Sequence, residues 1–283
     1  MFKNVYFVIC IYLVITVTFG QTYKILTNKM KNGGALTILA ELLSGVMCLL
    51  FVPLFEFKFP SNKWVYLFLS LACIFYALND RITTTVRSGL EASTVSMIKQ
   101  VKTVLMILAG LIIFKDPVVW NKILGAFLIV FANFLVFYKK GSLKRNRYVN
   151  LGILSCICLT IALLIDVNYS DEFNLPLYVS FTALVPALFI FIFDKVKIKD
   201  LVDEYKNSNK LLLFIVGITW SIMMILGLYV YWLGNVSVIA PLCSLTVILN
   251  VVIGYLFLNE KDNLVKKLIA ATLIIISVIL IKM

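Results

Sequence analysis

Long apolar runs separated by short polar connectors are the feature that most constrains this chain. Each run is long enough to cross a hydrocarbon core of about 30 Å as a helix that rises about 1.5 Å per residue. The runs are continuously apolar rather than alternating, which favours helices over a β-barrel. We therefore predict an all-α, polytopic membrane protein with ten transmembrane helices. The predicted spans are 4–23, 33–54, 63–80, 90–114, 118–138, 149–167, 175–194, 210–232, 236–258 and 263–282.

Composition excludes several other classes of protein. Of 283 residues, 62% are hydrophobic and 14% are charged, and the formal net charge is +12. Most basic residues lie in the connectors, which indicates cytoplasmic loops rather than binding of nucleic acid. Histidine is absent, and no CxxC pair, nucleotide-binding loop or catalytic constellation occurs. We therefore expect no enzyme activity, cofactor or metal, and six cysteines that serve only in packing.

Two lysines interrupt the fourth run, in "SMIKQVKTVLMILAGLIIF". Lys99 and Lys102 are three residues apart and so share one helix face. On a helix that starts near Leu90 they lie about 14 and 18 Å from its end, too deep to reach water easily. A charge at this depth is typical of a functional site. The main alternatives are a structural salt bridge between helices or a span displaced toward one surface.

Glu41 is a further internal charge, at a depth close to that of Lys99. We predict that the two pair across the bundle, since burial of both charges is tolerable only in that case. A static pair and a pair that opens during transport fit the sequence equally well. The remaining candidates for substrate binding are polar or aromatic side chains on the fourth, eighth and ninth runs: Ser96, Thr103, Trp220 and Ser244.

Other polar or special residues in the runs have structural interpretations. Asn79, Asp80 and Arg81 close the third predicted span and are expected to be solvated at a helix end. Asp166 lies near the end of the sixth span and is interpreted in the same way. Pro241, inside the ninth span, removes a backbone hydrogen bond and predicts a kink.

The chain contains an internal repeat. A shift of 144 positions pairs Ser93 with Ser237 and Asp116 with Glu260. We predict two repeats, residues 1–143 and 144–283, within one membrane domain. Five spans per repeat is an odd number, so the halves would have opposite orientations, as in many carriers. The connectors on the N-terminal side carry far fewer Lys and Arg residues than the opposite connectors, which predicts that both termini lie outside the cell.

The closing segment "GNVSVIAPLCSLTVILNVVIGYLFLNEKDNLVKKLIAATLIIISVILI" (234–281) resembles the EamA-like branch of the drug/metabolite transporter superfamily. The shared features are a Val-Ser and then a Pro at the entry to the ninth span, and the "GYLFLNE" exit. Residues 89–140 are similar to the first-half copy of the same unit. The resemblance implies ten helices, in two inverted halves of five, around a central cavity. It also implies cytoplasmic termini, against the charge distribution, so orientation stays open.

A second likeness is to nucleotide-sugar transporters of the same superfamily. It rests on "YALNDRITTTVRSGLEASTVSMIKQVK" (76–102), with its Tyr-Ala, Leu-acidic-Ala and Gln-x-Lys elements. The likeness implies a phosphate-recognising lysine at Lys102 or Lys99. The ninth run departs from that pattern because its polar residues are all uncharged: Ser237, Ser244, Thr246 and Asn250.

Together these features predict a permease that moves a small polar or anionic metabolite by alternating access. The alternatives are a nucleotide-sugar or phosphate-ester exchanger, a membrane scaffold without transport, and a membrane-embedded enzyme. The expected partners are the metabolite and the lipid bilayer, with no nucleic acid, and the protein is expected to be a monomer or homodimer. We expect a multi-pass protein of the plasma membrane, or of an organelle membrane in a eukaryote.

Overall fold

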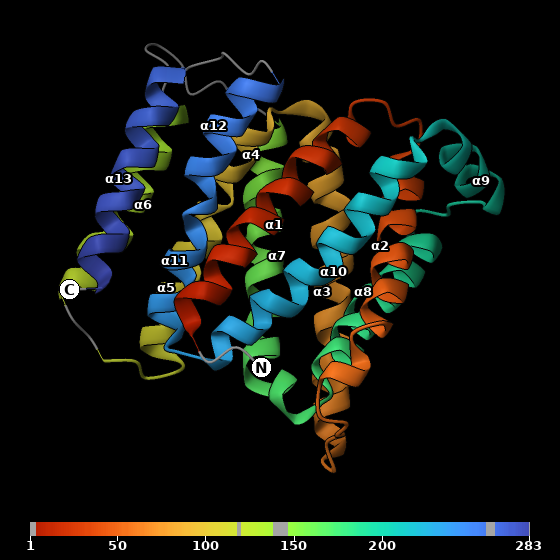
Figure 1. Ribbon diagram of the computed structural model, residues 1–283, viewed down its shortest axis with the longest axis horizontal. Coiled ribbons are helices and arrows are strands. Elements are labelled where there is room, and N and C mark those ends of the chain that lie inside the picture. The colour runs from red at the N-terminus through yellow and green to blue at the C-terminus, as the bar shows by residue number, and fades with distance from the viewer. Residues whose placement is uncertain (1–3, 118–119, 138–146, 259–263, 283) are drawn as a thin grey trace.

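The protein is a bundle of helices (Figure 1). The computed structural model describes residues 4–117, 120–137, 147–258 and 264–282, and within them no strand occurs. The prediction of an all-α protein is therefore confirmed. The helices are α1 (Val5–Thr27), α2 (Gly33–Leu49), α3 (Lys63–Gly89), α4 (Ala92–Ile98), α5 (Gln100–Ile112), α6 (Trp120–Phe137), α7 (Arg147–Tyr169), α8 (Leu175–Phe193), α9 (Ile198–Asn207), α10 (Lys210–Trp232), α11 (Val236–Ser244), α12 (Thr246–Leu258) and α13 (Leu264–Lys282), with short 3₁₀ turns η1 (Val52–Leu54) and η2 (Ser170–Glu172).

The length, composition and surface of the helices identify a membrane protein. Within the described residues, seven helical segments are long and apolar enough to cross a bilayer. Their outward side chains include Leu67 and Phe257, which are 57% and 77% exposed. So much exposed apolar surface suits contact with lipid rather than water. The seven segments are Val5–Thr27, Lys63–Gly89, Ala92–Ile112, Arg147–Glu172, Leu175–Phe193, Lys210–Trp232 and Val236–Phe257.

Helix α3 corrects one predicted boundary. The span predicted to end at residue 80 continues as helix to Gly89, so Asn79 and Asp80 lie within it. The polar tail stays helical because its hydroxyl groups bond to the helix's own carbonyls, Thr84 to Asp80 O at 3.0 Å and Thr85 to Arg81 O at 3.3 Å. Asn79 is 3% exposed and is not solvated. The tail therefore brings polar side chains into the bundle.

Two of the predicted single spans are each divided into a pair of helices. The span 90–114 is broken at Lys99 between α4 and α5, and the span 236–258 is broken at Leu245 between α11 and α12. Pro241 lies in α11, four residues before the second break, and cannot donate a helical hydrogen bond. At the first break the side-chain amide of Gln100 donates to Ser96 O at 3.3 Å and competes with the backbone ladder.

Helices from the two ends of the chain pack against one another. The pairs α1–α10, α2–α8 and α3–α7 form one side of the molecule, and α6 and α13 lie together on the opposite side (Figure 1). Between them α4 contacts α12, and α5 contacts α11. The predicted boundary between the repeats, 143/144, lies outside the described residues, as does Glu260.

The short helix α9 lies at one end of the bundle, beside α2 (Figure 1). Its Glu204 is 1% exposed and accepts hydrogen bonds from the backbone N–H groups of Lys31 and Asn32, at 2.9 and 2.8 Å. These are among the donors that precede α2 and would otherwise lack partners. The surface segment 195–209 thus fastens the start of α2.

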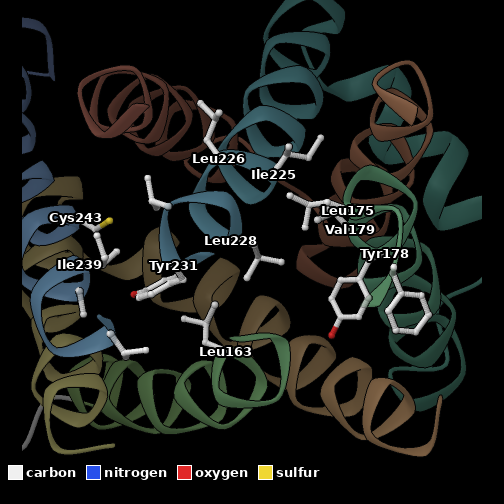
Figure 2. Packing of buried hydrophobic residues seen from close by; sticks show 14 of the residues in the cluster. Leu163, Leu175, Tyr178, Val179, Ile225, Leu226, Leu228, Tyr231, Ile239 and Cys243 are labelled. Carbon is white, nitrogen blue, oxygen red and sulfur yellow. The ribbon is translucent and has the colours of Figure 1, made fainter. Parts of the chain in front are cut away.

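A central apolar cluster joins the two halves of the chain. Figure 2 shows Leu163 of α7 beside Leu228 and Tyr231 of α10, with the Tyr231 ring extending toward the side where Ile239 and Cys243 of α11 lie. Five of the six cysteines are buried, Cys10 is exposed, and all six are free thiols. The cluster matters for function because its inner side chains form one wall of a cavity.

Candidate functional site

A cavity of about 150 Å³ lies inside the bundle, between helices that come from both halves of the chain. At the share of about 30 Å³ that one molecule occupies in liquid water, that volume corresponds to roughly five water molecules. Apolar side chains such as Leu163 and Leu228 form one wall, and charged and amide side chains from α3, α4, α5 and α12 form much of the rest. A polar cavity at this depth can hold a hydrated or charged small molecule.

Six of the seven side chains that the sequence singled out line this cavity. Lys99 lies at the break between α4 and α5, where the helical pattern of backbone hydrogen bonds is interrupted, and Lys102 lies in the first turn of α5. Their ammonium groups form neither an ion pair nor a hydrogen bond with other described residues. Positive charge is therefore available to a ligand. The six lining residues are Ser96, Lys99, Lys102, Thr103, Trp220 and Ser244.

Glu41 is placed differently from the prediction. It does not line the cavity, and it is 0% exposed within α2. The predicted ion pair with Lys99 is not formed, and neither carboxyl oxygen has a hydrogen-bond partner among the described residues. The reason is that the side chain of Glu41 faces Asp80 of α3 instead.

Arg87 is a charged residue of the cavity that the sequence analysis missed. It is 5% exposed, at the end of α3. Its guanidinium group lies over the rings of Phe19 and Tyr23, 5.3 and 5.6 Å from their centroids, and Nη1 donates to Gly20 O at 2.9 Å. Aromatic faces attract such a cation and hold its plane in place. Lys24 Nζ donates to Arg87 O at 2.5 Å and so fixes the end of the helix.

The signal for this face of α3 is present in the sequence. Asp80, Thr83 and Arg87 recur at intervals of three and four residues, the spacing of one helix face. All three line the cavity. The sequence analysis placed Asp80 at a solvated helix end and did not consider Thr83 and Arg87, because the predicted span ended at residue 80, where the chain becomes polar.

Asp80 brings negative charge to the same cavity. Its charged neighbours are Lys99, Arg87 and Glu41, and Asn79 Nδ2 donates to its Oδ1 at 2.7 Å. Among the described lining residues, Asp80 carries the one carboxyl group, whereas Arg87, Lys99 and Lys102 carry cationic groups. The described wall of the cavity thus carries an excess of positive charge when all four groups are ionised.

Trp220, one of the predicted substrate-binding residues, is already in contact with neighbouring aromatic rings. Its ring centroid is 5.3 Å from that of Phe19 and 6.1 Å from that of Tyr23, and it is 6% exposed. These are the rings that support Arg87. Trp220 therefore contributes mainly by holding that aromatic group in position, with one edge at the cavity.

A further buried carboxyl group, Asp166, lies outside the cavity and is fully satisfied. It is 0% exposed and accepts hydrogen bonds from Tyr76 Oη at 2.5 Å and Tyr178 Oη at 2.7 Å. The three residues belong to α7, α3 and α8. The sequence analysis placed Asp166 at a solvated helix end. The structure corrects this, because the two tyrosines supply the donors that water was expected to provide.

Comparison with known proteins supports the fold alone. No family model and no curated protein matches the chain. A solved crystal structure is similar with a TM-score of 0.61, at 12% identity, over 96% of this chain and 98% of its own. The likeness covers nearly the whole length of both chains, so this arrangement of helices occurs in another protein. The fold and the cavity define an all-helical membrane protein with a polar internal site.

Proposed function

We propose that this protein is a secondary transporter that moves a small anionic metabolite by alternating access, without ATP. The observation that carries the proposal is the charge of the cavity. Arg87, Lys99 and Lys102 face the same space as a single described carboxyl group, Asp80. Cations buried without equal counter-charge are costly unless a ligand supplies it. A bound anion would do so.

The contacts between helices support the inverted five-plus-five arrangement, one of the repeat architectures that carriers use. Helices α4 and α11 begin at Ala92 and Val236, which is the offset of 144 residues found in the sequence. In such a repeat α7 corresponds to α1 and α10 to α3, so the observed contact α3–α7 maps onto the observed contact α10–α1. In the same way, α4–α12 maps onto α11–α5. Paired halves of this kind can rock about a central site.

The two interrupted helices support the proposal as well. Carriers bind their substrates near the mid-plane, at helices that are broken there. Lys99 marks one break, and Ser244 directly precedes the other, at Leu245; both side chains line the cavity. The resemblance of 89–140 and 234–281 to EamA-like transporters is consistent with this placement.

The size and charge of the cavity favour one substrate class over another. A volume of about 150 Å³ is below the range of about 300–1,000 Å³ that is usual for drug-sized ligands. This favours a small metabolite over a nucleotide sugar. The excess of cations favours a doubly charged anion, so a phosphate-ester exchanger is the second candidate.

A binding screen followed by counterflow tests the proposal. Purified protein is screened by thermal shift against inorganic phosphate, glycerol phosphate, succinate and lactate, and hits are assayed for counterflow in proteoliposomes. A charge-assisted hydrogen bond is worth about 1.5–3 kcal/mol, so Lys102→Gln should weaken binding by about 10- to 150-fold. Lys199→Gln, the same change at an exposed residue, is the matched control.

The outcomes separate the alternatives. Counterflow of a hit that is lost in Lys102→Gln and kept in Lys199→Gln supports the transporter. Equal binding of every hit by the wild type and Lys102→Gln would exclude the lysine as the binding group. Binding without counterflow would favour a scaffold or an enzyme.

A further inference from the structure

Glu41 is a buried charged side chain that the anion site does not use. It lies in the middle of α2, is 0% exposed, and has no hydrogen-bond partner for either oxygen among the described residues. Asp166 is equally buried but has a tyrosine donor for each oxygen. An ionised carboxylate without a donor is far more costly to bury than a neutral carboxylic acid. The surroundings of Glu41 therefore suit the acid form.

The group that faces Glu41 is another acid. Asp80 lies on α3, which packs against α2, and its carboxyl group is the acidic neighbour whose charge acts on Glu41. Two adjacent carboxylates repel each other, whereas a carboxylic acid can donate its proton to a neighbouring carboxylate. A single proton between them would relieve the repulsion and supply the donor that Glu41 lacks.

The other ionisable groups around Glu41 and Asp80 do not supply the hydrogen-bond donor that Glu41 lacks. Tyr23 of α1 and Cys73 of α3 also interact with Glu41, and Tyr23 Oη is hydrogen-bonded to Thr84 Oγ1 at 2.8 Å. Helix α8 carries Tyr178 as its ionisable side chain, and this residue donates to Asp166. The ionisable residues of α10 lie toward the ends of that helix: Lys210, Tyr229 and Tyr231.

Asp80 connects this buried pair to the cavity. Asp80 lines the cavity, whereas the two oxygens of Glu41 are sealed from it. Lys99 and Arg87 are the cations that interact with Asp80. An anion that binds these cations would compete with Asp80 for their charge, so that Asp80 would hold a proton more readily. Occupancy of the anion site and protonation of the pair are thereby linked.

We propose that Glu41 and Asp80 form a proton-binding site that shares one proton and exchanges it with the cavity. The site itself stands on burial and contact. Its role in coupling rests on the proposed transport function, in which a proton would accompany the anion. The ion coupled to transport would then be a proton, which Glu41 of α2 and Asp80 of α3 would hold beside the substrate.

Infrared spectroscopy of the purified protein in lipid tests the site without any substrate. The wild type should show the carbonyl stretch of a protonated carboxyl group at neutral pH, and Glu41→Gln should lose it. Asp166→Asn, a change at another buried acid, should keep the signal. Asp80→Asn should shift the frequency of that stretch, because the neighbouring carboxylate that would share the proton of Glu41 is then gone. Retention of the full signal in Glu41→Gln would overturn the proposal.

Transport in proteoliposomes tests coupling separately. A pH gradient should accelerate uptake of labelled phosphate or succinate, whichever shows counterflow, by the wild type. Glu41→Gln should keep counterflow and lose the stimulation. Wild-type counterflow that does not respond to a pH gradient would overturn coupling and leave the transporter standing. Absence of all counterflow, with the infrared signal lost in Glu41→Gln, would refute the transporter and keep the proton site.

Discussion

The hydrogen bonds to Asp166 give a quantitative test of how this bundle is held together. Tyr76→Phe removes one of the two donors to a carboxyl group that is 0% exposed, without changing the shape of the core. A hydrogen bond to a charged acceptor contributes about 1.5–3 kcal/mol. An ordinary hydrogen bond between membrane helices contributes about 0.6 kcal/mol. The measured loss therefore reports whether Asp166 is ionised.

The assay is equilibrium unfolding in mixed micelles, applied to a double-mutant cycle. We expect Tyr76→Phe and Tyr178→Phe each to lower the free energy of unfolding by about 1.5–3 kcal/mol. The double variant should cost more than the sum of the two, because it leaves the carboxylate with no donor from either tyrosine. Tyr255→Phe, at a residue that is 42% exposed, is the control and should have little effect.

Two results would refute this reasoning. A loss of about 0.6 kcal/mol or less for Tyr76→Phe would mean that Asp166 is neutral or that the hydrogen bond is not formed. Additive effects of the two tyrosine variants would mean that the hydroxyl groups do not share one acceptor. A loss near zero would remove the link that we describe between α3, α7 and α8, and additive effects would reduce it to two separate contacts.

Two further predictions concern helix contacts. A Cβ atom at Gly45 would lie 2.6 Å from Leu184 Cγ, so Gly45→Ala should force α2 and α8 apart and lower stability by about 1–3 kcal/mol in the same unfolding assay; an unchanged midpoint would contradict the close approach. Lys267 is 2% exposed and bonds to Glu91, whose side chain is 26% exposed, so Lys267→Met should leave that acid without its cation and cost about 1–3 kcal/mol. The double change Lys267→Met with Glu91→Gln should recover most of the loss; no recovery would show that the pair is not the cause.

The positions of the helices could be predicted from the sequence because the requirement that creates them is local. In lipid each span must satisfy its own backbone hydrogen bonds, so a long apolar run is already a helix. Each predicted run coincides with a helix or a helix pair. The depth of Lys99 and Lys102 in the membrane could also be predicted, from the helical rise per residue. Both side chains line the cavity.

The end of α3 could not be predicted in this way. Its last turns are polar, and a rule based on apolar length stops where polarity begins. They remain inside the bundle because Arg87 is held by Phe19 and Tyr23 from α1, which are more than sixty positions away in the chain. Only the packing of α1 against α3 decides that this arginine faces the cavity.

The partners of the buried acids were likewise decided by tertiary structure. Depth alone suggested that Glu41 would meet Lys99, but depth does not specify the direction in which a side chain points around its helix. The rotation of α2 turns Glu41 toward Asp80, and the packing of α3 and α8 against α7 turns two tyrosines toward Asp166. Hydrophobic length sets how far a residue lies in the membrane, whereas the faces that neighbouring helices present set which residue it meets.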